Sequence, residues 1–343
     1  MIYKYNFLEK LLHKLVLKNN FLARLIFDLE KKIYLLDNYE NIKNREHVFI
    51  CGLARSGSTL LLKNIYDYFN FASFTYRDMP FILSPNTFSS ISKKLFNKTS
   101  IKIERAHKDN VIISNNDPEA FEEIFWKFIS NNKYISENSL NIYDHTTFEL
   151  QEFKKLVNLS LIKNNTNIYL SKNNNNILRI NSIINIFPNS KILLTYRNPI
   201  QHAQSLLNQH INFTHLQHQD KFVKEYMEMI GHYEFGIKKK IFNVDNKKNP
   251  YDEYELNHWL FEWIRIYNYI FKNYKLNRNV TFIDYDKYCK DKNFYLSKIF
   301  NTDKNFSSED IFSSNKNKKI MEIDKNLELN SLELYENILS QPI

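Results

Sequence analysis

The chain has 343 residues, of which 43% are hydrophobic and 15% aromatic, so its composition excludes wholesale disorder and allows a large packed core. Its 2 cysteines, Cys51 and Cys289, exclude a disulfide scaffold and a cysteine-based zinc site. The net charge of +9 comes without a dense run of Lys or Arg, so we attribute it to solvated lysines and expect no nucleic-acid partner.

Residues 1–44 carry leucine and isoleucine at helical spacings, which predicts an N-terminal helical arm. Such an arm can lie on a membrane surface or pack against the rest of the chain. We favour packing, because four acidic side chains oppose an anionic membrane: Asp28, Glu30, Asp37 and Glu40. A run of about 18 uncharged apolar residues, as a membrane span needs, is absent from the sequence. Because Glu9 and Lys10 also interrupt any signal-peptide core, we expect a cytoplasmic protein.

Three short apolar runs predict buried strands at 47–51, 190–196 and 280–284. Helical patterns alternate with them, and Pro199 is expected in the first turn of one helix. The other predicted helices are 119–130, 147–159, 220–240, 252–275 and 286–300. This alternation of strands and helices predicts an α/β fold with a mainly parallel sheet flanked by helices.

The asparagine-rich segment 164–176 is either a disordered linker or an ordered loop. Ile168, Tyr169 and Leu170 interrupt its polarity, so we favour the ordered loop.

Two of the chain's 4 glycines, Gly52 and Gly57, follow the first predicted strand directly and precede a helical pattern. A glycine loop between a strand and a helix presents backbone N–H groups and the helix N-terminus to an anion. Ser58 stands where the lysine of a nucleotide-hydrolysing phosphate loop belongs, which disfavours a kinase or NTPase. Arg55 instead places a fork-shaped cation inside the loop, suited to phosphate or sulfate oxygens.

The segment 53–59, LARSGST, resembles the Pro-Arg/Lys-Ser-Gly-Thr-Thr loop of sulfotransferases that use 3′-phosphoadenosine 5′-phosphosulfate (PAPS), with Ala54 in place of the usual proline. A second segment, TYRNPIQHAQSLL, resembles the family's Arg-Asp/Asn-Pro-x5-Ser signature and carries Arg197 and Ser205. The guanidinium and hydroxyl of these two residues suit one phosphate, and we expect Ser205 to face Arg197. The layout of residues 46–300 is similar to that of tyrosylprotein-sulfotransferase-like and bacterial sulfotransferases.

The resemblance implies a phosphate-loop NTPase-like fold that binds PAPS without a metal. The donor contacts that it implies are Ala54, Arg55, Ser56, Gly57, Ser58 and Thr59 from the loop, with Arg197 and Ser205 from the second segment. Sulfuryl transfer needs cations at the leaving oxygen and a base for the acceptor hydroxyl.

Arg55 and Lys172 are the expected catalytic cations, since Lys172 resembles the family lysine that lies between the two phosphate motifs. For the base, Asp78 resembles the acidic residue that similar enzymes place after the first helix, His107 is an alternative, and a third possibility is that neither serves. The acceptor is expected to be a hydroxyl of a saccharide, lipid, small molecule or peptide, which the sequence does not distinguish.

The predicted organisation is an arm at 1–45, a sulfotransferase domain at 46–305 with a helical acceptor-side insertion at 72–165, and a partly helical C-terminal segment at 306–343. Two alternatives to sulfuryl transfer are a phosphate-loop kinase and a non-catalytic protein that binds polyanions or carbohydrates on the same fold. The sequence indicates no oligomeric state.

Overall fold

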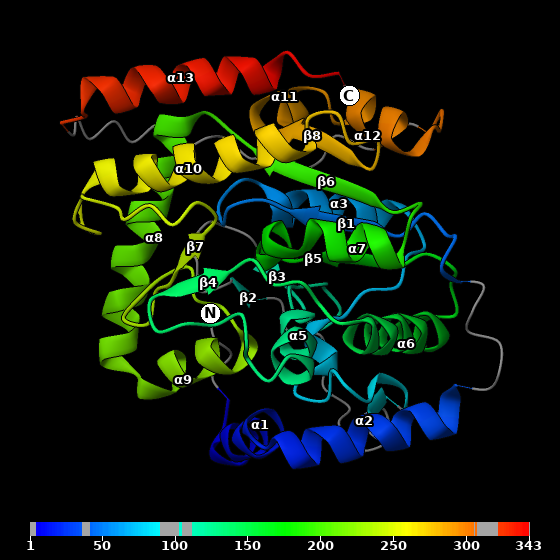
Figure 1. Ribbon diagram of the computed structural model, residues 1–343. Coiled ribbons are helices and arrows are strands. Elements are labelled where there is room, and N and C mark those ends of the chain that lie inside the picture. The colour runs from blue at the N-terminus through cyan, green and yellow to red at the C-terminus, as the bar shows by residue number, and fades with distance from the viewer. Residues whose placement is uncertain are drawn as a thin grey trace.

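A four-stranded parallel sheet forms the centre of the molecule, with the strand order β5-β1-β6-β8 (Figure 1). The computed structural model describes residues 5–35, 42–89, 103–104, 112–304, 306 and 322–342. The strands are β1 (Val48–Cys51), β5 (Leu170–Lys172), β6 (Lys191–Tyr196) and β8 (Val280–Asp284). The α/β fold and its three predicted strands are confirmed, whereas β5 lies inside the segment expected to be a loop.

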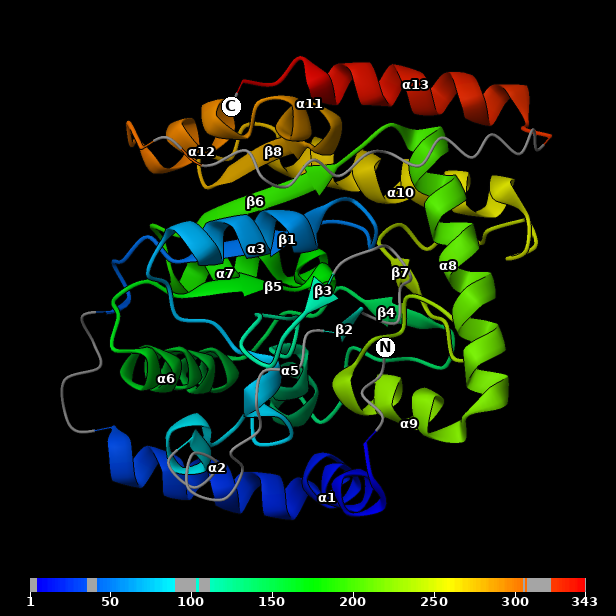
Figure 2. The same cartoon turned by 180° about the vertical axis from the view of Figure 1, so that it is seen from behind.

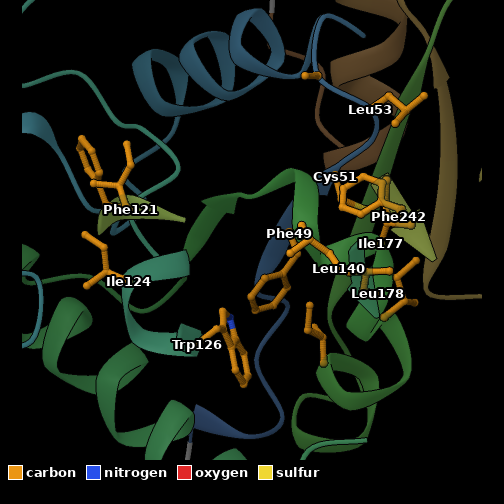
Figure 3. Packing of buried hydrophobic residues seen from close by; sticks show 14 of the residues in the cluster. Phe49, Cys51, Leu53, Phe121, Ile124, Trp126, Leu140, Ile177, Leu178 and Phe242 are labelled. Carbon is orange, nitrogen blue, oxygen red and sulfur yellow. The ribbon is translucent and has the colours of Figure 1, made fainter. Parts of the chain in front are cut away.

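Alternate residues of β1 face two apolar clusters, as the period of a strand requires. Val48 and Ile50 pack with Leu61 and Leu62 of α3 (Ser58–Tyr68), which lies in front of the sheet in Figure 2. Phe49 and Cys51 face the larger cluster on the opposite side. Figure 3 shows this second cluster extending from Phe121 and Trp126 to Leu53 and Phe242. The sheet is therefore buried on both faces, as parallel sheets usually are.

The register brings the carboxyl ends of three neighbouring strands to one edge of the sheet. Ile50 pairs with Lys172 of β5 and with Leu193 of β6, and Cys51 pairs with Leu194. The segments that follow β1, β5 and β6 consequently leave the sheet side by side. Ligands of open α/β sheets bind at this edge.

The predicted arm is two helices, α1 (Phe7–Lys18) and α2 (Asn20–Tyr34), which meet at Asn19. Asn19 ends α1 and caps α2, because its side chain accepts a hydrogen bond from Leu22 N–H. Helix α1 packs on α9 (Lys221–Ile230) and α2 on α6 (Thr147–Asn164). Among the described residues, no helix combines the length and apolar character needed to cross a membrane.

Two other helix predictions differ from the structure. The helix expected at 220–240 ends at Gly231, whose φ of 77° and the bond from His232 N–H to the Met227 carbonyl form a left-handed cap. The helix expected at 286–300 is α11 (Tyr285–Lys290) followed by α12 (Lys292–Phe300). Asp291 ends the first and caps the second through its side chain.

The remaining predicted helices are present with shifted bounds: α5 (Glu123–Ile129), α6, α8 (Pro199–Gln219) and α10 (Leu256–Tyr274). Pro199 begins α8, as expected. Elements without a sequence prediction are η2 (Tyr76–Asp78), β2 (Ile103–Glu104), β3 (Ile112–Ile113), β4 (Ser139–Asn141), η3 (Asn174–Arg179), α7 (Ile180–Ile186) and β7 (Ile241–Asn243). Helix α13 (Lys325–Leu339) lies in the C-terminal segment predicted to be partly helical and packs along α10 (Figure 1).

Candidate functional site

The loop between β1 and α3 can only be built with glycine at both ends. Gly52 has φ 148° and Gly57 has φ 88°, backbone conformations that L side chains rarely adopt. A Cβ at Gly52 would overlap the Thr195 carbonyl of β6, and one at Gly57 would overlap the Tyr285 ring at the end of β8. Residues of β6 and of the segment after β8 therefore lie directly against the loop, so the fold requires glycine at both positions.

Side chains from β6, α8 and α10 hold the loop in place. Ser56 Oγ and Thr195 Oγ1 are 2.6 Å apart and hydrogen bonded. His202 Nε2 donates to the Ala54 carbonyl at 2.8 Å, while Trp263 Nε1 donates to His202 Nδ1 at 3.2 Å. Burial lowers the pKa of His202 to about 3, so the ring is neutral and carries its proton on Nε2. This hydrogen bond could not be predicted from the sequence, because Ala54 and His202 are 148 positions apart.

We expect His202 to make the protein sensitive to acid. Its pKa of about 3 lies below the ordinary value of 6.5, so the unfolded chain binds more protons between these values. The free energy of unfolding therefore falls as the pH drops below 6.5. In urea unfolding, His202→Gln should reduce this pH dependence by about 1.4 kcal/mol per pH unit near pH 5. The exposed His218→Gln should leave it unchanged, and equal slopes in the two variants would contradict a buried neutral His202.

Arg55 and Ser205 meet at the loop. Arg55 adopts a left-handed backbone with φ 71°, and its Nε donates to Ser205 Oγ of α8 at 3.3 Å. Ser205 was expected to face Arg197, yet the hydrogen bond that the structure gives it is with the loop arginine. The two motifs recognised in the sequence are therefore joined through Arg55.

Arg197 follows β6 at the same edge of the sheet. Its guanidinium lies 5.1 Å from the centroid of the Tyr285 ring, and Nη2 donates to Gln201 at 3.2 Å. Its Nε is buried and has no hydrogen-bond partner among the described residues. A buried N–H without a partner is rare in proteins, so this donor is suited to an acceptor from a ligand.

Lys172 ends β5 beside the loop and is paired with a carboxylate that the sequence analysis did not single out. Lys172 Nζ lies 3.4 Å from Glu119 Oε1, and the side chains are only 8% and 9% exposed. Tyr76 donates to the other oxygen of Glu119 at 3.2 Å. The pair is buried at the carboxyl edge of the sheet, where a cation and a carboxylate can act on one bound group.

Asp78, which was expected to be the base, is held by contacts within the fold. One of its oxygens accepts from the N–H and the hydroxyl of Thr75, at 2.8 and 3.1 Å. The other is paired with the ammonium of Lys163. Both oxygens of Asp78 are therefore engaged within the fold, and its role as the base stays a prediction. The alternative, His107, lies outside the described residues.

A cleft lies beside the loop. Its apolar lining includes Leu53, Ala54, Leu206, Phe242, Trp259 and Ile266. Charged and polar groups such as Lys239 and His258 also line it. Its position next to Ala54 makes it a possible site for the apolar body of a small ligand.

Comparisons with known proteins indicate the family and the fold of the chain. A sequence model of the sulfotransferase family matches residues 47–243, which contain both motifs and Lys172. The fold is similar to that of sulfotransferase STF1 from Mycobacterium tuberculosis H37Rv, with TM-score 0.50 and 11% identity over 86% of this chain and 77% of that one. Sulfotransferase STF9 from Mycobacterium avium gives a TM-score of 0.46 and 11% identity over 94% and 75% of the two chains. No curated protein sequence matches the chain significantly.

Proposed function

Because the chain belongs to the sulfotransferase family, we propose that it transfers a sulfuryl group from PAPS to a hydroxyl acceptor. The observation that carries this proposal is the pair of arginines at adjacent strand ends, Arg55 after β1 and Arg197 after β6. A donor with phosphates at two positions needs two separate cationic sites at one edge of the sheet.

The residues present fit such a donor. Helix α3 begins at Ser58, directly after the loop, and the positive end of its dipole favours an anion there. Arg55 adds a cation within the same loop, and we assign the 5′ end of the donor to it. The buried Nε of Arg197 supports a second phosphate site, which we assign to the 3′-phosphate. We also assign to the donor the hydroxyl of Ser205, which accepts a hydrogen bond from Arg55.

PAPS, when bound, supplies a sulfuryl group whose bond to the phosphate oxygen breaks as the acceptor oxygen attacks the sulfur. We assign Arg55 and Lys172 to the stabilisation of negative charge that develops on the departing oxygen. Glu119, 3.4 Å from Lys172, is our candidate for the base that takes the proton of the acceptor hydroxyl. We assign the body of the acceptor to the cleft beside Ala54 and Trp259.

Binding of the product nucleotide tests the donor site directly. We expect adenosine 3′,5′-bisphosphate to bind saturably, and Arg197→Ala to weaken the binding at least about tenfold, because charged hydrogen bonds of about 1.5 kcal/mol or more each are lost. Isothermal titration calorimetry provides the measurement. Arg278→Ala removes an exposed arginine and serves as the matched control. Unchanged binding in Arg197→Ala would sink the assignment of this site.

Transfer itself is tested with labelled PAPS and a cell extract, followed by identification of the labelled product. A labelled product that depends on Arg55 supports the proposal. Magnesium-dependent ATP turnover in place of sulfate transfer would favour a kinase. Polyanion binding that is unaltered in Arg55→Ala, with no transfer to any acceptor, would favour a non-catalytic binding protein.

A further inference from the structure

The two N-terminal helices expose an apolar face that the packing of the fold does not use. On α1 this face consists of Phe7, Leu8, Leu11 and Leu15, and on α2 of Phe21, Leu25, Leu29 and Ile33. These eight side chains are between 46% and 79% exposed. They are nearly half of the exposed large apolar side chains among the described residues, although the two helices contain only 12 and 15 residues. We call them the outer apolar face.

The opposite sides of both helices are anchored to the body of the protein. The ring of His13 in α1 packs at a tilt of 50° against that of Tyr226 in α9, with centroids 5.8 Å apart. Phe27 of α2 is fully buried and contacts Phe125 and Phe128 of α5 edge-on. The helices therefore keep a fixed orientation and lie together along one side of the molecule (Figures 1 and 2). Eight exposed apolar side chains gathered on two neighbouring helices are typical of an interaction site.

The charges around the face favour anionic lipid. Three exposed lysines, Lys14, Lys18 and Lys32, lie among its residues. Of the acidic residues that opposed a membrane in the sequence analysis, Glu30 is turned inward, where Asn86 N–H donates to it at 2.6 Å. Asp28 is paired with Lys31 at 2.8 Å, and Asp37 and Glu40 lie outside the described residues.

The lysines among these residues also indicate whether the outer apolar face binds lipid or a protein partner. The cores of protein interfaces are depleted in lysine and enriched in tyrosine, tryptophan and arginine. Here the exposed apolar residues are only Phe, Leu and Ile, and lysines alternate with them. Lys14 and Lys18 both pair with Glu225 of α9, at 2.7 and 3.7 Å, yet their side chains remain 43% and 50% exposed. Amphipathic helices of this composition lie in the plane of a membrane surface with lysines directed at the headgroups.

We propose that α1 and α2 attach this protein to the surface of an anionic lipid membrane through the outer apolar face. The attachment is peripheral, with both helices parallel to the surface and the sulfotransferase fold outside the lipid. It is independent of the proposed reaction, since none of the residues of the face belongs to the candidate site.

Vesicle flotation tests the proposal with the full chain. We expect flotation with phosphatidylcholine vesicles that contain about one third phosphatidylserine, and much less with phosphatidylcholine alone. The variant Leu11→Gln, Leu15→Gln, Leu25→Gln, Leu29→Gln should lower partitioning at least about tenfold. Replacing Lys14, Lys18 and Lys32 by Gln should lower it about fivefold for each lysine, on anionic vesicles only.

The matched control is Leu276→Gln with Leu329→Gln, which removes two leucines that are 89% and 67% exposed elsewhere. It should float like the wild type, and thermal melts should show that all variants remain folded. Failure of the wild type to float, or equal flotation of the leucine variant, overturns the proposal. A dimer in sedimentation velocity that dissociates in the leucine variant, without lipid binding, would assign the face to a second copy of the chain instead.

Discussion

Glu119→Gln should lower the turnover number for sulfate transfer by about 10²- to 10⁴-fold, the usual contribution of a general base. The substitution keeps the size of the side chain and a hydrogen-bond acceptor for Tyr76, but it removes the ability to take a proton. The dissociation constant of adenosine 3′,5′-bisphosphate should change little, because the proposed donor contacts are Arg55, Arg197 and the loop. Steady-state kinetics with the identified acceptor, together with titration calorimetry, separate the two effects.

Two companion variants distinguish a base from a structural partner. Tyr76→Phe removes one hydrogen bond to the same carboxylate, at 3.2 Å, and leaves its charge in place, so we expect only a small loss of turnover. Asp78→Asn should reduce stability through Thr75 and Lys163, while the protein that remains folded retains its turnover. If Asp78→Asn instead abolishes turnover and Glu119→Gln does not, the base is Asp78.

The phosphate loop could be predicted from the sequence because its determinants are local. A strand, two glycines, an arginine and a helix follow one another within residues 48–68, and each step has a recognisable residue pattern. The second motif could be predicted for the same reason, since Arg197 and Pro199 lie at a strand-to-helix junction. The contact between Ser205 and Arg55 could not be predicted, because the two residues are 150 positions apart and meet only through the position of α8.

Glu119 could not be found in this way, because its contact with Lys172 spans 53 positions and depends on how the segment after Pro118 returns to the sheet. The asparagine-rich run was misleading for a related reason. Asn173, Asn174, Asn175 and Asn176 are all buried, and their amides donate to partners from α5 and the segment after α9. We expected an ordered loop here, whereas the four asparagines are buried because carboxylates such as Glu122 and Glu123 supply acceptors for their amides.

Arg179→Met should lower the free energy of unfolding by about 3–5 kcal/mol, the cost of leaving one charge of a buried pair alone. Arg179 forms two hydrogen bonds with Glu123, at 2.7 and 3.1 Å, and both side chains are almost completely buried. Burial acts to raise the pKa of Glu123, but Arg179 and the hydrogen bonds around it bring the pKa below its ordinary value. Urea unfolding at neutral pH provides the measurement.

The double variant Arg179→Met with Glu123→Met should recover only part of this loss, because it removes both charges but takes the acceptor away from Asn173 and Tyr134. Lys10→Met, which breaks an exposed pair with Asp220 at 3.8 Å, should cost less than about 1 kcal/mol. A similar loss of unfolding free energy for Lys10→Met and Arg179→Met would contradict the prediction that breaking the buried pair costs more than breaking the exposed one.

The same pair should also affect the candidate site through Asn173, which follows Lys172 directly. Glu123 accepts from Asn173 Nδ2 at 2.7 Å with the oxygen that also accepts from Arg179. Arg179→Lys keeps the positive charge but cannot form both bonds in the fork geometry, so we expect a stability between those of Arg179→Met and the wild type. If Glu123 positions Lys172 through Asn173, sulfate transfer by folded Arg179→Lys should fall while nucleotide binding at Arg197 is retained. Full transfer activity in that variant would show that the pair stabilises the fold without positioning Lys172.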